Sequence, residues 1–153
     1  MTPILFLDID GVLATEATHF EHGVFDPLCV RALNMLHERL QPDIVVSSTW
    51  RYGLNLRGLR QLFKQQGVRM PVIGSTPSCF RGGHKHGLVT SSTRGDEIAA
   101  WLTAYPTERP ILIIDDDKDM GALQDRLIQT ESVRGLTFED VDRAVALLMS
   151  VPA

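Results

Sequence analysis

The sequence predicts an α/β protein built on a parallel sheet, with helices on both faces of that sheet. Two apolar runs, residues 4–7 and 111–114, have the length of strands and lack the alternation of a half-exposed strand. Amphipathic segments of helical length lie between these runs and three weaker apolar runs. Strands that alternate with helices in this way form parallel sheets, so we expect a five-stranded, Rossmann-like sheet.

The length and composition are those of one ordinary globular domain, and we expect a single domain over residues 1–153. Hydrophobic residues make up 44% of the chain and charged residues 22%, and the net charge is −4. This charge excludes a global basic field for nucleic acid or an anionic membrane, so any polyanion site must be local. Cys29 and Cys79 form no CxxC motif, and we recognise neither a signal peptide nor a membrane-spanning run. We therefore expect a cytoplasmic protein with no membrane partner, and the sequence indicates no protein partner.

The first helix has a clear start signal after a polar segment. Residues 14–23 are polar and irregular, which indicates a loop or small hairpin over the end of the first strand. Asp26 followed by Pro27 is an N-cap with proline at the first helical position, and the helix should run to about Leu40. The apolar run 44–46 then predicts the second strand.

The second helix and the third strand follow. Leucines and a phenylalanine recur at helical spacing over residues 56–66, and Gly67 is suited to end that helix. The short apolar pair 72–73 predicts a strand. Residues 74–92 are rich in Gly, Ser and Thr, which predicts a long surface loop, and loops of that length are often functional.

Capping signals mark the two remaining long helices. Thr93 with Asp96 three residues later starts one helix, which ends before a proline at position 106. Thr137 with Asp140 starts the other, which runs over residues 138–149. Between them we expect the strand at 111–114, a helix near 121–127 and a short strand around residue 128.

Acidic residues follow both long apolar runs. Asp8, Asp10 and Gly11 come directly after the first run, and Asp115 and Asp116 directly after the second. A buried strand gains nothing from carboxylates at its end unless they are paired or bind a metal. If the two strands are neighbours, the four carboxylates meet at the carboxyl edge, where open α/β sheets bind ligands. Two carboxylates about 4 Å apart repel by roughly 4 kcal/mol at an effective dielectric near 20, so the cluster predicts a hard cation, Mg²⁺ before Ca²⁺.

These motifs together resemble the haloacid dehalogenase-like (HAD) phosphohydrolase superfamily. Its four motifs match Asp8-Ile9-Asp10-Gly11, the strand ending in Ser47, the basic residue Arg94, and Asp115-Asp116, in that order. The runs SSTWR, RGDEI and IIDDD are similar to the small HAD domains found in RNA-repair proteins. The resemblance implies a sheet of strand order 5-4-1-2-3 and no large cap domain, because neither connection that carries a cap in this superfamily is long enough to hold one.

The resemblance also implies a mechanism. Asp8 would attack phosphorus and form an aspartyl-phosphate, and Asp10 would act as general acid and then general base. Mg²⁺ would be held by Asp8, by the main-chain carbonyl of Asp10 and by Asp116, with Asp115 or Asp119 in support. Ser47 and Arg94 would bind the phosphoryl oxygens. Dehalogenation is disfavoured, since in this superfamily the second aspartate marks phosphoryl transfer.

An open, capless site suits a large substrate such as a nucleic-acid end, although a nucleotide would also fit. Ser48, Arg51 and Lys85 are the expected substrate contacts, and Trp50 offers a ring either for base stacking or for the core. Two alternatives are a phosphatase for small metabolites, closed by the 74–92 loop, and a metal-binding interaction module without turnover. The presence of both Asp8 and Asp10 disfavours the module.

Four local choices stay open on the sequence alone. Ser48 could replace Ser47 as the second motif, and Lys85 or Arg81 could replace Arg94 as the third. Arg94 could instead be a helix-start residue paired with Glu97. Either aspartate of the fourth motif could be the direct metal ligand.

Overall fold

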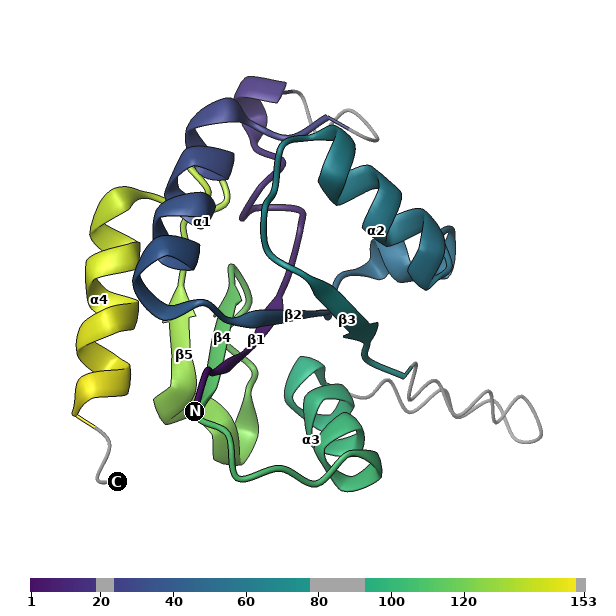
Figure 1. The fold of residues 1–153 in the computed structure, drawn as a ribbon, viewed down its shortest axis with the longest axis vertical. Coiled ribbons are helices and arrows are strands. Elements are labelled where there is room, and N and C mark those ends of the chain that lie inside the picture. The colour runs from purple at the N-terminus through teal and green to yellow at the C-terminus, as the bar shows by residue number, and fades with distance from the viewer. Residues whose placement is uncertain (19–23, 78–92, 151–153) are drawn as a thin grey trace.

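The computed structural model of the protein describes residues 1–18, 24–77 and 93–150 (Figure 1). Five strands form one parallel sheet with the order β3-β2-β1-β4-β5, which is the expected order 5-4-1-2-3 read from the other edge. The strands are β1 (Ile4–Leu7), β2 (Asp43–Val46), β3 (Val72–Ser75), β4 (Ile111–Asp115) and β5 (Leu127–Gln129). The central position of β1 between β2 and β4 confirms that the two acidic strands are neighbours.

The central strands are buried on both faces. Along β1, Leu5 and Leu7 belong to one hydrophobic cluster, while Ile4 and Phe6 belong to a second cluster on the opposite face. Successive side chains of a strand point to opposite sides, and β2 and β4 divide their residues between the two clusters in the same way. This two-sided burial explains why the runs in the sequence are continuous rather than alternating.

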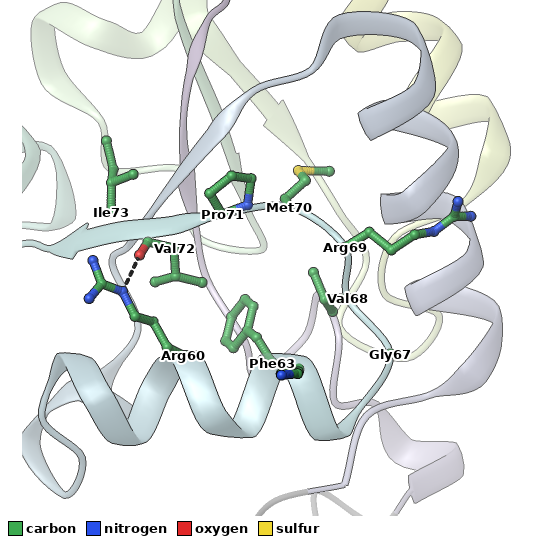
Figure 2. Close-up of a pocket in the computed structure, with 10 residues that line it drawn as sticks. Arg60, Phe63, Gly67, Val68, Arg69, Met70, Pro71, Val72 and Ile73 are labelled. Atoms are coloured by element: carbon green, nitrogen blue, oxygen red, sulfur yellow. Dashed lines mark hydrogen bonds between the residues drawn. The ribbon is translucent and has the colours of Figure 1, made fainter.

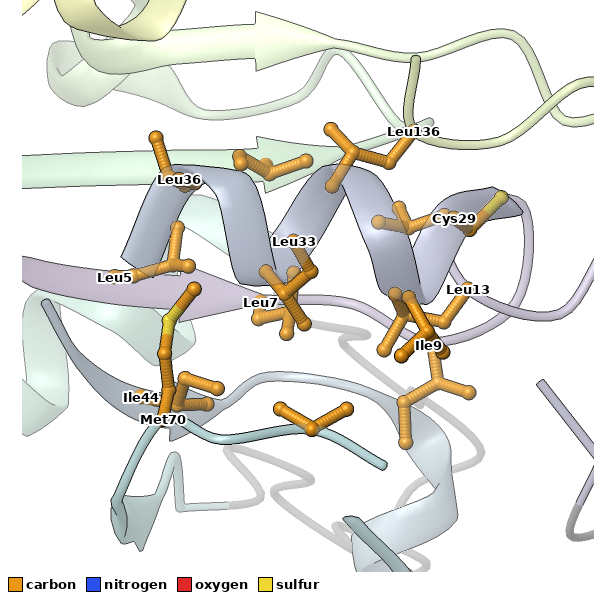
Figure 3. Packing of buried hydrophobic residues seen from close by; sticks show 14 of the residues in the cluster. Leu5, Leu7, Ile9, Leu13, Cys29, Leu33, Leu36, Ile44, Met70 and Leu136 are labelled. Carbon is orange, nitrogen blue, oxygen red and sulfur yellow. The ribbon is translucent and has the colours of Figure 1, made fainter. Parts of the chain in front are cut away.

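Helices cover both faces, as predicted. One face carries α1 (Pro27–Leu40), α2 (Leu56–Gln65) and α4 (Phe138–Met149), whose apolar sides join the cluster drawn in Figure 3. The other face carries α3 (Arg94–Ala104), where Trp101 packs edge-on against Phe6 with ring centroids 5.4 Å apart. None of the described helices combines the length and the apolar character needed to cross a membrane.

The helices begin at the residues that the capping signals predict. The Asp26 side chain accepts a hydrogen bond from the N–H of residue 28, and proline occupies the first helical position of α1. Thr93 with Asp96, and Thr137 with Asp140, each form a complete capping box at the start of α3 and α4. These caps fix where α3 starts, and therefore where its first side chain lies.

Two local expectations differ from the structure, and a third was left open by the sequence. The helix expected near 121–127 is a 3-10 helix, η4 (Gly121–Arg126), because the chain enters β5 directly after it. The segment expected as a loop from residue 74 begins inside β3, since Gly74 and Ser75 pair with the last residues of β2. For residues 14–23 the sequence left a loop or a small hairpin open, and the described part is a loop with a 3-10 turn, η1 (Glu16–Thr18).

The connections β1–α1 and β3–α3 are the places where a cap domain would be inserted. In their described parts, η1 is the one regular element, and residues 19–23 and 78–92 lie outside the described residues. The described residues therefore form the small α/β arrangement that the sequence predicts, and they contain no cap domain.

Candidate active site

Asp8 lies at the centre of the carboxyl edge of the sheet, directly after β1. Its N–H donates to the carbonyl of Ile114 (3.1 Å), which continues the pairing of β1 with β4 by one residue. Its Oδ1 accepts a hydrogen bond from the N–H of Ile9 (2.8 Å), and its side chain is buried. Ile9 is fully buried in the core on the α1 face, so this apolar anchor and the strand pairing together hold Asp8 in place.

The chain turns sharply after Asp10, which is partly exposed. The N–H groups of residues 12, 13 and 14 all converge on the carbonyl of Ile9, and the N–H of Gly11 donates to the carbonyl of Ala14 (2.8 Å). Gly11 has φ +79°, a conformation that favours glycine. A Cβ atom at this position would overlap the carboxylate of Asp116. The glycine therefore allows the acidic ends of β1 and β4 to approach each other.

Three carboxylates meet at this edge. One carboxylate oxygen from each of Asp8, Asp115 and Asp116 lies within 4.8 Å of the other two. Asp115 is fully buried and its Oδ1 accepts a hydrogen bond from the N–H of Asp117 (3.0 Å), whereas Asp116 is partly exposed. The side chain of Asp10 is not part of this group, so the expected role of Asp10 as a ligand depends on its main-chain carbonyl.

Arg94 reaches the same cluster from the first turn of α3. Its Nε lies 3.2 Å from Oδ2 of Asp115, and its Nη2 lies 3.9 Å from Oδ1 of Asp8. The start of α3 is held by the N–H of Gly95, which donates to the carbonyl of Asp119 (3.1 Å) after β4. The described ion pairs of Arg94 are with these two aspartates, and this geometry favours the third-motif role over a pair with Glu97.

The carboxylates affect one another strongly. Burial, and then the charge of Asp115, raise the pKa of Asp8 well above its ordinary value, while Arg94 lowers it. Burial likewise raises the pKa of Asp115 to about 6, against the lowering effect of Arg94. One guanidinium cannot compensate three carboxylates. The cluster therefore fits a divalent cation, and a donor set of oxygens without His or Cys is the set that Mg²⁺ prefers.

Ser47 and Ser48 follow β2, next to the central strand. The N–H of Ser47 donates to the carbonyl of Leu7 (2.9 Å), which places this fully buried residue beside the end of β1. The Oγ of Ser48 accepts a hydrogen bond from the N–H of Trp50 (3.2 Å) and caps a 3-10 helix, η2 (Thr49–Tyr52). A substrate contact by Ser48 would have to share its hydroxyl with this cap.

The described atoms do not place the remaining predicted substrate contacts, Lys85, Arg51 and Trp50, at the site. Lys85 lies outside the described residues, and for Arg51 only the backbone, within η2, is described. Trp50 is buried, with its ring centroid 6.1 Å from that of Phe25. Of the two roles left open for Trp50, the structure favours the core over base stacking, because its large apolar ring is buried.

Sequence reasoning missed Thr130, which connects the two acidic strands. This buried residue follows β5; its N–H donates to the carbonyl of Asp115 (3.0 Å) and its Oγ1 donates to the carbonyl of Gly11 (2.7 Å). The one available signal was its position at the end of a short strand, at the edge where the other site residues gather.

Comparison with known proteins agrees with this geometry. A family model described as the HAD domain in Swiss Army Knife RNA repair proteins matches residues 4–141. The match spans all five strands, together with Asp8, Arg94 and both aspartates of β4. No curated protein and no solved structure matches the chain.

Proposed function

Because the chain belongs to the family of HAD domains in Swiss Army Knife RNA repair proteins, we propose that it is a magnesium-dependent phosphomonoesterase acting on a nucleic-acid end or nucleotide. The observation that carries this proposal is the meeting of Asp8, Asp115 and Asp116 with Arg94 at one edge of the sheet. Carboxylates can serve as nucleophile and metal ligands, and a guanidinium can bind phosphoryl oxygens. The group thus contains the parts that phosphoryl transfer requires.

Asp8 is the proposed nucleophile. A carboxylate oxygen of Asp8 forms a bond to phosphorus while the ester oxygen–phosphorus bond breaks, which yields an aspartyl-phosphate. Two features support this role: the central position of Asp8 in the sheet, and the hydrogen bond from the N–H of Ile9 that orients its carboxylate. A nucleophile held in one orientation loses less entropy on reaching the reacting geometry.

Asp10 is the proposed acid and base. In the first step its carboxylic proton goes to the leaving ester oxygen, which departs as an alcohol. In the second step the carboxylate takes a proton from the water that attacks phosphorus, so that inorganic phosphate leaves and both aspartates return to their starting states. The partial exposure of Asp10 supports a role that needs contact with substrate and with water.

Arg94 and Ser47 are the proposed ligands of the phosphoryl oxygens. The Nη1 atom of Arg94 is buried and has no hydrogen-bond partner in the described structure, so a phosphoryl oxygen would satisfy a donor that otherwise carries a desolvation cost. Ser47 follows the neighbouring strand, and the capping bond of Ser48 favours Ser47 over Ser48 for this role.

Asp8, Asp116 and the main-chain carbonyl of Asp10 are the proposed holders of Mg²⁺. The bound ion would offset the negative charge that develops on the phosphoryl group. Asp115 is better suited to a supporting role, because its two oxygens are engaged by the N–H of Asp117 and by Arg94. Asp116 is the more exposed of the two and lies over Gly11, where it can reach a ligand from outside.

The test is release of phosphate from oligonucleotides carrying a 3′- or 5′-phosphate, from nucleotides and from a generic aryl phosphate, with and without Mg²⁺. We expect magnesium-dependent turnover that Asp8→Asn abolishes and that Asp125→Asn, an exposed aspartate of η4, leaves intact. No turnover by the folded protein with any divalent metal would contradict the proposal. Preference for small sugar phosphates over oligonucleotides would instead favour a metabolite phosphatase.

A further inference from the structure

The charged residues of the chain are divided unevenly along the sequence. Residues 44–95 contain eight Lys or Arg and no Asp or Glu. The rest of the chain contains the other seven basic residues and all 19 acidic residues. One third of the sequence therefore carries a charge of +8 and the remainder −12, which gives the net charge of −4. Such asymmetry indicates a local polyanion surface within an acidic protein.

The basic segment includes α2, which presents three cations on one side. Arg57, Arg60 and Lys64 are exposed and are spaced three and four residues apart, so they lie along one face of the helix. The described structure gives Arg57 and Lys64 no ion pair, and α2 itself contains no acidic residue. With a rise of 1.5 Å per residue, the three charges extend over about 10 Å.

This helix leads away from the candidate active site. The chain passes from Ser47 through η2 to Asn55, which caps α2, so the first turn of α2 follows the carboxyl edge closely. The helix then runs back along the sheet, and the chain enters β3 beside Ile44, at the opposite end of β2 (Figure 1). Arg57 is accordingly the cation nearest the site and Lys64 the farthest.

A groove of about 610 Å³ lies at the far end of this row, between α2 and the chain that enters β3 (Figure 2). Its floor is apolar, its basic rim is contributed by Arg60, Lys64 and Arg69, and no acidic residue lines it. Arg60 donates from Nε to the carbonyl of Val72 (2.8 Å), and its two Nη groups make no further hydrogen bond in the described structure. Arg69 is 3.5 Å from Glu38, but both side chains are more than 60% exposed, so this pair is weak.

We propose that the α2 face and this groove, together named the α2 docking surface, bind a single-stranded nucleic acid. The row of cations would contact successive phosphates, and the apolar floor would receive a base or sugar. The placement of the strand's phosphorylated end at Asp8 rests on the proposed function, whereas the docking surface itself does not. In the described structure this surface pairs a linear row of unpaired cations with a recessed apolar groove.

Two other partners fit the surface less well. A peptide that adds a strand to the edge of the sheet would need the carbonyl of Val72, which Arg60 already occupies. A membrane would need a broad patch of projecting apolar side chains, whereas in the groove Pro71 and Ile73 are exposed but Phe63, Met70 and Val72 are at most 5% exposed.

The test is a salt titration of binding. The anisotropy of a short, fluorescently labelled single-stranded RNA is followed with the full chain in buffer without divalent metal, for wild type and for Arg57→Gln/Lys64→Gln. The matched control is Arg126→Gln/Arg134→Gln, which flanks β5 at the opposite edge of the sheet and changes the net charge equally. Far-ultraviolet circular dichroism of each variant verifies folding.

We expect weaker binding by the α2 variant at every salt concentration. The plot of log K against log salt has a negative slope, and each lost phosphate contact makes it shallower by about 0.7 for single strands. Two lost contacts therefore reduce the magnitude of the slope by about 1.4. The control should keep the wild-type slope. Equal slopes for all three proteins would overturn the proposal, and so would a wild type that binds anionic vesicles but no RNA. Binding as expected without phosphate release would leave the docking surface standing and contradict only the proposed function.

Discussion

Gly11 and Asp116 lie so close together that no side chain fits between them. A Cβ atom on Gly11 would overlap both the carboxylate carbon and an oxygen of Asp116, and Gly11 has φ +79°. The contact joins the turn after β1 to the end of β4. The contact therefore fixes the separation between the carboxylates of Asp8 and Asp116, which are proposed to share one metal ion.

This contact predicts the effect of Gly11→Ala. The methyl group would displace Asp116, and the positive φ would cost about 1–2 kcal/mol in addition. We expect loss of magnesium-dependent turnover and a lower free energy of unfolding. Gly121→Ala is the matched control, because Gly121 has φ +58° and an added Cβ would meet nothing within 4 Å. Urea unfolding and a magnesium titration of activity measure both effects, and equal losses in the two variants would contradict this interpretation of the contact.

The raised carboxyl pKa values predict how stability depends on pH in the absence of metal. The pKa of Asp115 is about 6 in the folded protein, above its ordinary value of 3.8, and that of Asp8 is raised as well. The folded state therefore binds more protons than the unfolded state between these values. The contribution of Asp115 to stability is fully present below about pH 4 and is lost as the pH rises through about 6.

Urea unfolding in EDTA across this range measures the effect. We expect the difference in unfolding free energy between wild type and Asp115→Asn to change with pH over that window, since the asparagine does not titrate. Added Mg²⁺ should stabilise the wild type at neutral pH, where the carboxylates are ionised, and should stabilise Asp115→Asn less. A pH-independent difference between the two proteins would contradict the prediction.

Thr130 provides a third test, because its hydroxyl bonds the turn after β1 while its N–H bonds the end of β4. Thr130→Val keeps the shape of the side chain but leaves the buried carbonyl of Gly11 without its donor, which should cost about 1–3 kcal/mol. Thr130→Ser keeps the donor and should retain most of the stability. If the bond positions the carboxylates, Thr130→Val also raises the magnesium concentration needed for half-maximal activity, and Thr130→Ser restores it. A valine variant that loses stability but keeps its magnesium dependence would limit Thr130 to a purely structural role.

The sequence was most informative where burial leaves a simple pattern. The runs that become β1 and β4 are continuous because both faces of the sheet are covered, and parallel neighbours bring their acidic ends to one edge. With the strand order that the resemblance implies, the two runs predict that Asp8 and Asp115 lie close together, as they do in the folded chain. The capping boxes at Thr93 and Thr137 located two helices for a similar reason, since their signal is local.

Features that depend on tertiary contacts could not be predicted from the sequence. Thr130 matters only because a three-residue strand brings it beside Gly11, and such a short strand leaves little pattern in the sequence. The burial of Trp50 depends on Phe25 being packed nearby, which spacing along the chain does not reveal.

Gly95 determines where Arg94 lies. A Cβ atom on Gly95 would overlap the backbone carbonyl of Met120, so Gly95→Ala must move the first turn of α3 away from the chain that follows β4. The backbone of Met120 cannot move aside as a flexible side chain can, so the first turn of α3 must shift. Arg94 moves together with that turn. Gly58→Ala in α2 is the matched control, because the nearest atom to its Cβ would be a side-chain carbon of Leu54 at 3.2 Å, and a helical Gly-to-Ala change can gain up to about 1 kcal/mol.

We expect Gly95→Ala to lower the turnover of an aryl phosphate, and the pH profile identifies the cause. Arg94 lowers the pKa of both Asp8 and Asp115, so moving the guanidinium away lets those pKa values rise. The acidic limb of the activity profile then shifts to higher pH, whereas a general loss of folded protein would lower the profile without shifting it. Gly58→Ala should leave the acidic limb in place. An unshifted limb in Gly95→Ala, with turnover equal to that of the control, would show that the close contact with Met120 does not position Arg94.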